Sequence, residues 1–343
     1  MASKNGDIVA RVELGAAPLT IGREAGQALV LADTDVSRRH ARVTFERGEV
    51  RIEDLGSTNG CFLNGQRIGA ATTLKEGASL RIGNHHLKYE RRSRQDVERE
   101  ASLERDLKRA SSYVLSLLPL PLTDGSVRVD WRFIPSAQLG GDAFGYYWLD
   151  PGTFVFYLLD VSGHGAGSAM HSVTVLNVLR QRALPHVDFA DPAAVLASLN
   201  NRFQMDSHNG LFFTIWYGVY HTADRQLRYA SAGHHAAYLV DPDRRTSQPL
   251  GMSAMMVGAL PELDYDVAQV TVPAGSTLHV FSDGIFEVLT PEKRWSLTDF
   301  EPFLVQPQIP NTSEPERLYQ AVRTATGGVP FDDDASLMTL TFP

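Results

Sequence analysis

Short runs of alternating apolar and polar residues fill the first ninety positions, and turns rich in Gly, Asn and Asp separate them. Such alternation puts one face of each strand in a core and the other in solvent, which is typical of an antiparallel β-sandwich. The dipeptide Asn64-Gly65 between two such runs favours a type I′ hairpin. The sequence therefore predicts a small all-β unit, with strands expected at 7–14, 42–46, 49–53, 79–82 and 86–90.

The pattern becomes helical between Ser93 and Pro119, where strong helix formers follow one another without a Gly. An apolar residue recurs there at spacings of four and three, at Leu103, Leu107, Ala110, Val114 and Leu117. This seam covers about two heptads, which is short for a coiled coil. Two interpretations stay open: the helix packs its stripe on the following domain, or it is a parallel dimer helix that carries a signal between domains.

From residue 120 onward, apolar strands alternate with amphipathic helices. We expect helices at 167–184 and 192–203, the second capped by Asp191, then a hairpin of 212–220 with 226–231 and a strand at 235–240. Helices grouped after one pair of strands and before the next indicate a layered α+β sandwich.

Carboxylates stand at the ends of several apolar runs in this half. Asp160 follows the run 153–159 and precedes a glycine-rich turn, and a strand buried on both faces tolerates a charge only when something pairs with it. Asp142 follows two glycines, Asp283 follows the run 278–282, and an acidic triplet occupies 332–334. Several converging carboxylates suit a hard divalent cation.

The bulk composition narrows the functional classes. A chain of 343 residues is long enough for two domains and a connector. A net charge of -8 without a Lys/Arg cluster argues against nucleic acid or a membrane surface as partner. One cysteine, Cys61, excludes an internal disulfide and a thiolate metal cage, and no apolar stretch approaches the roughly 20 residues of a membrane span. We therefore expect a cytoplasmic protein.

Three loop clusters in the first ninety residues carry a family resemblance. They are Ile21-Gly22-Arg23, Ser37-Arg38-Arg39-His40-Ala41 and Leu55-Gly56-Ser57-Thr58-Asn59-Gly60, and together they resemble the forkhead-associated (FHA) domain. The resemblance implies binding of phosphothreonine in partner proteins through Arg23, Ser37, Arg38, Thr58 and Asn59, with His40 bracing the loop from inside. A guanidinium, a hydroxyl and an amide suit a phosphate, although each polar residue alone more often caps a turn.

Five motifs in the second half occur in the order found in the SpoIIE-type bacterial branch of the metal-dependent protein phosphatases, relatives of the type 2C enzymes. They lie at 140–142, 160–165, 232–235, 281–284 and 333–336. The resemblance implies an α-β-β-α sandwich that binds two Mn²⁺ or Mg²⁺ ions and hydrolyses phosphoserine or phosphothreonine in proteins. Such ions lower the pKa of a shared water and balance the charge of attacking and leaving oxygens.

Carried over by position, the resemblance makes Asp160 the ligand of both ions. Asp283 and Asp333 would complete the first site, and Asp142 with the main-chain carbonyl of Val161 would serve the second. These four aspartates are the expected catalytic residues. The neighbours Asp332 and Asp334 are equally well explained as solvated turn acids.

Two features depart from the family pattern. Gly145 stands where the family commonly has another acid, which predicts a weakly held second ion. The arginine that grips substrate phosphate in the eukaryotic relatives is not identifiable, so phosphate binding would rest on the metals. His164 either protonates the leaving oxygen or stabilises its turn, and His234 and His235 present the same choice.

The sequence thus predicts a multidomain protein: an FHA domain at 1–92, a helical linker at 93–119 and a SpoIIE-type phosphatase domain at 120–343. The leading hypothesis is a protein serine/threonine phosphatase with an FHA regulatory module, acting on a phosphorylated anti-sigma-factor antagonist of the STAS type, and a homodimer through the linker is an open option. The alternative is a catalytically weak phosphoprotein-binding scaffold. Four carboxylates aimed at one point favour the enzyme.

Overall fold

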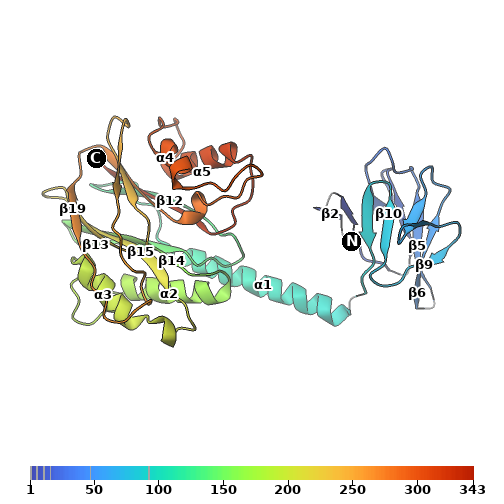
Figure 1. Ribbon diagram of the computed structural model, residues 1–343, viewed down its shortest axis with the longest axis horizontal. Coiled ribbons are helices and arrows are strands. Elements are labelled where there is room, and N and C mark those ends of the chain that lie inside the picture. The colour runs from blue at the N-terminus through green and yellow to red at the C-terminus, as the bar shows by residue number, and fades with distance from the viewer. Residues whose placement is uncertain (1, 5–6, 11, 16, 47, 92) are drawn as a thin grey trace. The chain divides into compact units, whose positions relative to one another are not determined.

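The computed structural model describes the whole chain except residues 1, 5–6, 11, 16, 47 and 92 (Figure 1). The chain forms two compact units, residues 1–102 and 103–343, and the division falls within the helix α1 (Arg94–Leu117). Arg11, inside the first predicted strand, and Arg92, the last residue of the predicted FHA domain, lie outside the described residues. The domain boundaries at 92 and 119 stay a proposal.

The first unit is a sandwich of two β-sheets around one apolar core. The strand orders are β2-β1-β11-β10-β7-β8 and β4-β3-β5-β6-β9. The strands are β1 (Ala2–Lys4), β2 (Asp7–Ala10), β3 (Leu19–Gly22), β4 (Leu29–Val30), β5 (Ala41–Glu46), β6 (Glu49–Asp54), β7 (Cys61–Leu63), β8 (Gln66–Arg67), β9 (Thr72–Thr73), β10 (Ser79–Ile82) and β11 (His85–Lys88). The predicted all-β unit is confirmed, although its first strand ends at Ala10 rather than Leu14.

The predicted hairpin between β7 and β8 is confirmed. Asn64 and Gly65 have φ angles of 49° and 83°, and a type I′ turn needs positive φ at both central residues. Phe62 pairs with Arg67 and Leu63 with Gln66 across the turn. Local turn chemistry was sufficient to predict this element.

The second unit has four layers, with two five-stranded sheets packed face to face between two pairs of helices (Figure 1). The sheet β13-β14-β15-β16-β19 is covered by α2 and α3, and the sheet β12-β21-β20-β17-β18 by α4 and α5. The strands are β12 (Arg128–Ile134), β13 (Ala143–Asp150), β14 (Thr153–Val161), β15 (Phe213–His221), β16 (Gln226–Ala232), β17 (Ala237–Val240), β18 (Ser247–Leu250), β19 (Ala268–Thr271), β20 (Ser276–Phe281) and β21 (Ala335–Phe342). The predicted α-β-β-α sandwich is confirmed.

The helices of this unit are α2 (Ala166–Arg180), α3 (Pro192–Arg202), α4 (Leu297–Leu304) and α5 (Glu314–Ala325), with short 3₁₀ turns at η1 (Met205–Ser207) and η2 (Asp283–Ile285). The predicted cap of α3 is confirmed, because the Asp191 side chain accepts a hydrogen bond from the Ala193 N–H at 3.2 Å. α2 ends at Arg180, a turn before the predicted end. The two helices that cover the second sheet, α4 and α5, were not predicted.

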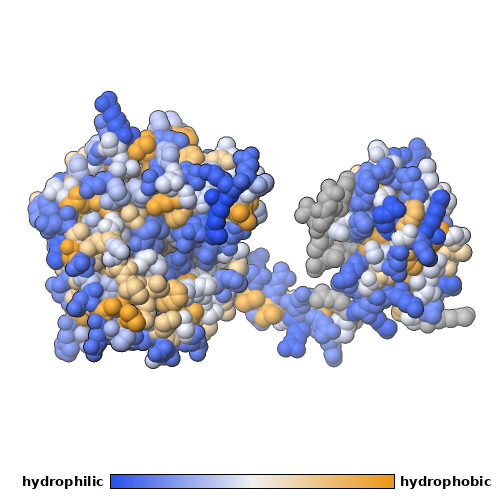
Figure 2. Space-filling model, in the orientation of Figure 1, coloured by the Kyte–Doolittle hydropathy of each residue, from blue (hydrophilic) through white to orange (hydrophobic). Residues whose placement is uncertain are grey.

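The apolar seam of α1 packs only at its C-terminal end. Leu117 packs against the core under α2, and the next residue, Leu118, is buried between the two sheets. Farther back, Leu103 is 59% exposed, and polar residues predominate on the visible face of this helix (Figure 2). The interpretation that the whole stripe packs on the following domain is therefore wrong for residue 103. No helix among the described residues is both long and apolar enough for a membrane span.

Candidate metal centre and phosphopeptide loops

The ends of strands from both sheets of the second unit bring four aspartates together. Asp160 lies near the end of the inner strand β14, and Asp142 immediately precedes the neighbouring edge strand β13. Asp283 follows β20 and Asp333 precedes β21, which are adjacent strands of the other sheet. The carboxylates of Asp283 and Asp333 both act electrostatically on Asp160, so the two sheets contribute to one cluster.

The charges in this cluster repel one another. Burial, and then the charge of Asp160, raises the pKa of Asp142 well above its usual value. Burial, and then the charges of Asp283 and Asp333, raises the pKa of Asp160. Burial and neighbouring carboxylates also raise the pKa of Asp283 to about 6. A cluster in which the strongest charge effects come from other carboxylates is one that a cation would stabilise.

Two glycines permit the close approach of the loops that carry these acids. A Cβ on Gly141 would lie 2.8 Å from the carbonyl oxygen of Val161, so only glycine fits against that oxygen. A Cβ on Gly284 would collide with the backbone of Asp334. The glycines next to Asp142 and Asp283 are therefore required by packing.

Asp334 is not a solvated turn acid. It is 3% exposed, and its carboxylate accepts hydrogen bonds from the Gly141 N–H at 2.6 Å, the Ser136 N–H at 2.8 Å and the Ser136 hydroxyl at 3.1 Å. A carboxylate bonded to backbone N–H groups holds a loop firmly. Asp334 thus fixes the glycine loop that carries Asp142, whereas Asp332 and Asp333 are exposed. The expectation of a solvated Asp334 was wrong, because the contacts that bury it come from residues almost 200 positions earlier.

His234 joins the two sheets beneath the cluster. Its Nε2 lies 3.0 Å from the Phe281 carbonyl oxygen and its Nδ1 lies 2.9 Å from the Thr214 hydroxyl. Thr214 pairs with Asp160 across β14 and β15, and Phe281 precedes Asp283 by two residues. Burial, and then His235, lowers the pKa of His234 well below its usual value, so the ring is neutral.

The bonds of His234 also define its tautomer. A carbonyl can only accept, so Nε2 carries the proton, and Nδ1 accepts from the threonine hydroxyl. The sequence left two roles open for His234, proton donor to the leaving oxygen or stabiliser of its turn. Its burial and its two bonds favour a structural role, although the bonds reach strands of both sheets rather than its own turn. Its neighbour His235 stacks on it and packs against Phe281 and Phe286.

Two further residues lie at the cluster. His164 is exposed on the glycine-rich turn and acts electrostatically on Asp333. Glu287 was missed in the sequence: its N–H donates to the Asp283 carbonyl at 2.8 Å, and it is the largest charge acting on Asp283. The spacing of four residues on a helical turn was a signal that could have found it.

The residues fit a hard divalent cation in kind. Carboxylates and main-chain carbonyls are the oxygen donors that Mg²⁺ and Mn²⁺ prefer. Among the described residues, no three of these carboxylates offer ligand atoms that all lie within 4.8 Å of one another.

Packing explains why position 145 holds a glycine where the family commonly has an acid. It pairs with Tyr157 across β13 and β14, and a Cβ there would collide with the Tyr157 ring and hydroxyl. Tyr157 is fully buried and stacks on Tyr217 under α2 and α3. The space available to a side chain at position 145 is thus filled by an aromatic ring.

In the first unit, hydrogen bonds tie together the three loops that the resemblance singled out. The Arg23 N–H donates to the Ser37 carbonyl at 3.1 Å, and the Thr58 N–H donates to the Ser37 hydroxyl at 3.1 Å. The Asn59 amide donates to the Asp35 carbonyl at 2.9 Å. Arg23, Arg38, Thr58 and Asn59 are exposed and Ser37 is half-buried.

His40 lies beneath these loops. Its Nδ1 accepts from the Ser37 N–H at 3.0 Å and its Nε2 lies 3.3 Å from the Gly60 carbonyl, so it braces two loops from inside. His40, Asp54 and Cys61 lie close enough together to suggest a metal site. Asp54 already accepts from both Ser57 groups and from the Cys61 N–H, so these side chains are used structurally.

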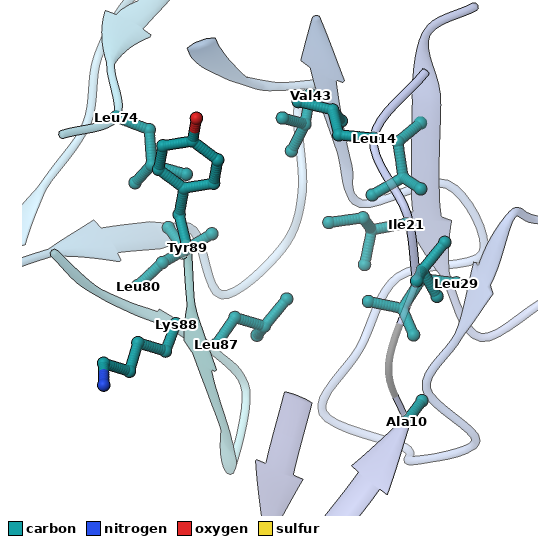
Figure 3. Close-up of a pocket in the computed structure, with 12 residues that line it drawn as sticks. Ala10, Leu14, Ile21, Leu29, Val43, Leu74, Leu80, Leu87, Lys88 and Tyr89 are labelled. Carbon is teal, nitrogen blue, oxygen red and sulfur yellow. The ribbon is translucent and has the colours of Figure 1, made fainter. Parts of the chain in front are cut away.

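Neither of two hollows coincides with these sites. A cavity of about 70 Å³ between the sheets of the first unit is lined almost entirely by apolar side chains (Figure 3). That volume is too small for a peptide. A hollow of about 790 Å³ in the second unit is lined by residues 121–123, 128–130 and 308–315 and by two threonines of β21, and its lining does not include the four aspartates.

Comparisons with known proteins agree with this division of the chain. Residues 150–343 match the family model of Stage II sporulation protein E (SpoIIE), and residues 19–83 match the FHA domain. The chain is 26% identical over 196 residues to the phosphoserine phosphatase RsbP of Bacillus subtilis, covering 56% of this chain and 46% of that protein.

The FHA part is 44% identical over 73 residues to the FHA domain-containing protein FhaB of Mycolicibacterium smegmatis, covering 21% of this chain and 47% of FhaB. The chain therefore spans about half the length of the curated relatives it matches. The solved SiaA-PP2C domain of Pseudomonas aeruginosa superposes with a TM-score of 0.58 at 21% identity, covering 71% of this chain and 98% of that one. This likeness shows the fold.

Proposed function

The chain belongs to the SpoIIE family and carries an FHA domain, and from this premise we propose that it is a metal-dependent protein serine/threonine phosphatase. The observation that carries the proposal is the cluster of Asp142, Asp160, Asp283 and Asp333 at the strand ends of both sheets. Relatives that match the second unit are named phosphoserine phosphatases, which supports the same chemistry.

In this proposal each carboxylate has a defined task. Asp160 is the ligand that two ions share, Asp283 and Asp333 complete one site, and Asp142 with the Val161 carbonyl completes the other. Two Mn²⁺ or Mg²⁺ ions would activate water and balance the charge that develops on the phosphate oxygens. The close approach of Gly141 to the Val161 carbonyl and the mutual repulsion of the carboxylates support this assignment.

Surrounding residues hold the ligands in place. The Ser336 hydroxyl donates to Asp142 at 2.7 Å and so orients its carboxylate. Asp334 anchors the Gly141 N–H, and His234 keeps the ends of β15 and β20 together. His164, exposed beside Asp333, is placed to donate a proton to the leaving serine or threonine oxygen.

We propose further that the FHA unit binds a phosphothreonine segment through Arg23, Ser37, Arg38, Thr58 and Asn59. Two exposed guanidiniums beside a hydroxyl and an amide suit a phosphate. The substrate of the second unit would be a phosphoprotein, with a phosphorylated anti-sigma-factor antagonist as the specific candidate. The exposure of Leu103 and Ala110 on the seam of α1 leaves room for a homodimer through this helix.

Hydrolysis of a phosphoserine peptide by the full chain, with Mn²⁺ and with EDTA, tests the enzymatic proposal. We expect phosphate release with Mn²⁺ and none with EDTA. A phosphoprotein-binding scaffold, the alternative, would bind the peptide and release no phosphate in either buffer.

A further inference from the structure

A hairpin places Arg294 against Glu287, the residue whose charge acts most strongly on Asp283. The backbone N–H of Trp295 donates to the Val288 carbonyl at 2.9 Å, and Leu289 and Arg294 form an antiparallel β-bridge. The Thr290 hydroxyl donates to the Lys293 carbonyl at the turn. This geometry directs the Arg294 guanidinium to Glu287, with 2.6 Å between Nη2 and Oε2. The charge of Glu287 acts on both Asp283 and Asp333, so the ion pair holds Arg294 next to a side chain that influences two expected metal ligands.

The pairing of Arg294 with Glu287 is easily exchanged. The side chain of Arg294 is 67% exposed and that of Glu287 is 41% exposed. Exposed ion pairs contribute only about 0–1 kcal/mol to stability, so an arginine held in this way loses little when it changes partner. A guanidinium has a planar set of donors that matches a phosphate in bidentate fashion.

The candidate metal centre carries more negative than positive charge, so a cation near it would favour phosphate binding. Two divalent ions, if bound as proposed above, supply four positive charges. Six carboxylates act on the centre: Asp142, Asp160, Asp283, Asp333, Asp334 and Glu287. With Arg294 counted beside Glu287, five positive charges face six negative ones, so an excess of one negative charge remains and would repel a phosphate monoester. A guanidinium that moves from Glu287 to the phosphate would place its charge on the substrate itself and so reduce that repulsion.

We propose that Arg294 binds the phosphate group of the substrate, leaving Glu287 when the phosphate arrives. The inference rests on the proposed phosphatase function and adds to it a phosphate-binding residue that the sequence did not reveal. The alternative is that Arg294 only neutralises the charge of Glu287 and so influences metal binding at Asp283 indirectly.

A double-mutant cycle separates these two roles. The variants are Arg294→Ala, Glu287→Gln and the double change, with Lys293→Ala as matched control, because Lys293 pairs with Asp299 and not with Glu287. The readouts are KM and kcat for p-nitrophenyl phosphate with Mn²⁺, and the Kd of inorganic phosphate for the Mn²⁺-loaded full chain by calorimetry. The Mn²⁺ concentration for half-maximal binding is measured in parallel.

We expect Arg294→Ala to raise both the KM and the phosphate Kd about tenfold, with kcat and the Mn²⁺ midpoint within about twofold of wild type. The same loss should persist in the Glu287→Gln background, and Lys293→Ala should change neither constant. If the loss disappears once Glu287 is neutral, or if only the Mn²⁺ midpoint moves, Arg294 is a neutralising residue and the proposal is wrong.

The calorimetry also separates this inference from the proposed function. A wild-type chain that hydrolyses no ester but binds phosphate through Arg294 would contradict the phosphatase and support the binding role. A wild-type chain that hydrolyses the ester with a KM indifferent to Arg294→Ala would leave the phosphatase standing and overturn the inference.

Discussion

Replacing Asp334 with Asn should destabilise the second unit and weaken its hold on metal. Asparagine keeps the shape but turns one acceptor oxygen into an NH₂ group. The least disruptive orientation keeps both bonds to Ser136 and sets that NH₂ against the Gly141 N–H, which now donates to Asp334 at 2.6 Å. The change therefore removes one charge-assisted hydrogen bond and leaves one buried N–H without a partner.

The magnitude follows from those two losses. A hydrogen bond to a charged group contributes roughly 1.5–3 kcal/mol, and an unsatisfied buried group costs roughly 1–3 kcal/mol, so we expect a loss of about 2.5–6 kcal/mol. The glycine loop that carries Asp142 should loosen as well, which should raise the Mn²⁺ concentration required for half-maximal activity about tenfold or more.

Urea unfolding followed by tryptophan fluorescence measures this loss directly. All four tryptophans, at 131, 148, 216 and 295, lie in the unit 103–343, so the signal reports that unit alone. Asp332→Asn is the matched control, because Asp332 is exposed and should change the unfolding free energy by less than about 0.5 kcal/mol. If Asp334→Asn unfolds like the control, the carboxylate does not anchor the loop and our account of position 334 fails.

Three further changes test other parts of the structure. Arg23→Ala should weaken binding of a phosphothreonine peptide tenfold or more, because a charge-assisted pair is worth roughly 1.5–3 kcal/mol, and it should leave ester hydrolysis unchanged. Arg39→Ala serves as the control, and equal binding of phosphorylated and unphosphorylated peptide by the wild type would argue against the site. Replacing both Leu107 and Val114 of α1 by Glu should alter turnover several-fold if the seam docks on the phosphatase unit, and should also lower the mass measured by light scattering if the seam forms a dimer. An unchanged mass and an unchanged rate would make α1 a passive spacer. In EDTA, Asp160→Asn should raise the urea midpoint at pH 8, and this advantage should shrink as the pH falls toward 5. The reason is that the pKa of Asp160 is raised in the folded chain, so the wild type loses stability as the pH rises above the unfolded pKa near 4. A variant that is less stable than the wild type at pH 8 would show that this charge does not destabilise the fold.

The local elements of this protein could be predicted from its sequence, and the long-range contacts could not. Asn64-Gly65 and Asp191 each carry their own turn or cap chemistry, so neighbouring residues were sufficient. Asp333 and Asp334 are chemically identical neighbours, and only contacts with Ser136 and Gly141, nearly 200 residues away, bury the second one. No local pattern contains that information.

The centre shows the same limit. Its aspartates could be identified because each stands at the end of an apolar run, and the resemblance supplied their order. The bridge through His234 depends on two strands from different sheets, Thr214 on one and Phe281 on the other, which no spacing reveals. The pairing of Arg294 with Glu287 could not be predicted for a related reason, because it depends on the hairpin that brings the two residues together and not on a sequence motif.

The central claim is that two cations share the carboxylate of Asp160, and turnover of Asp160→Asn across a range of Mn²⁺ concentrations tests it most directly. The probe is a simple phosphate ester, and the wild-type chain is measured in the same series. We expect the wild type to reach a plateau as Mn²⁺ increases, and Asp160→Asn to show no turnover even at the highest concentration, because the ligand common to both ions is gone. Wild-type turnover by Asp160→Asn at saturating Mn²⁺ would contradict the shared site.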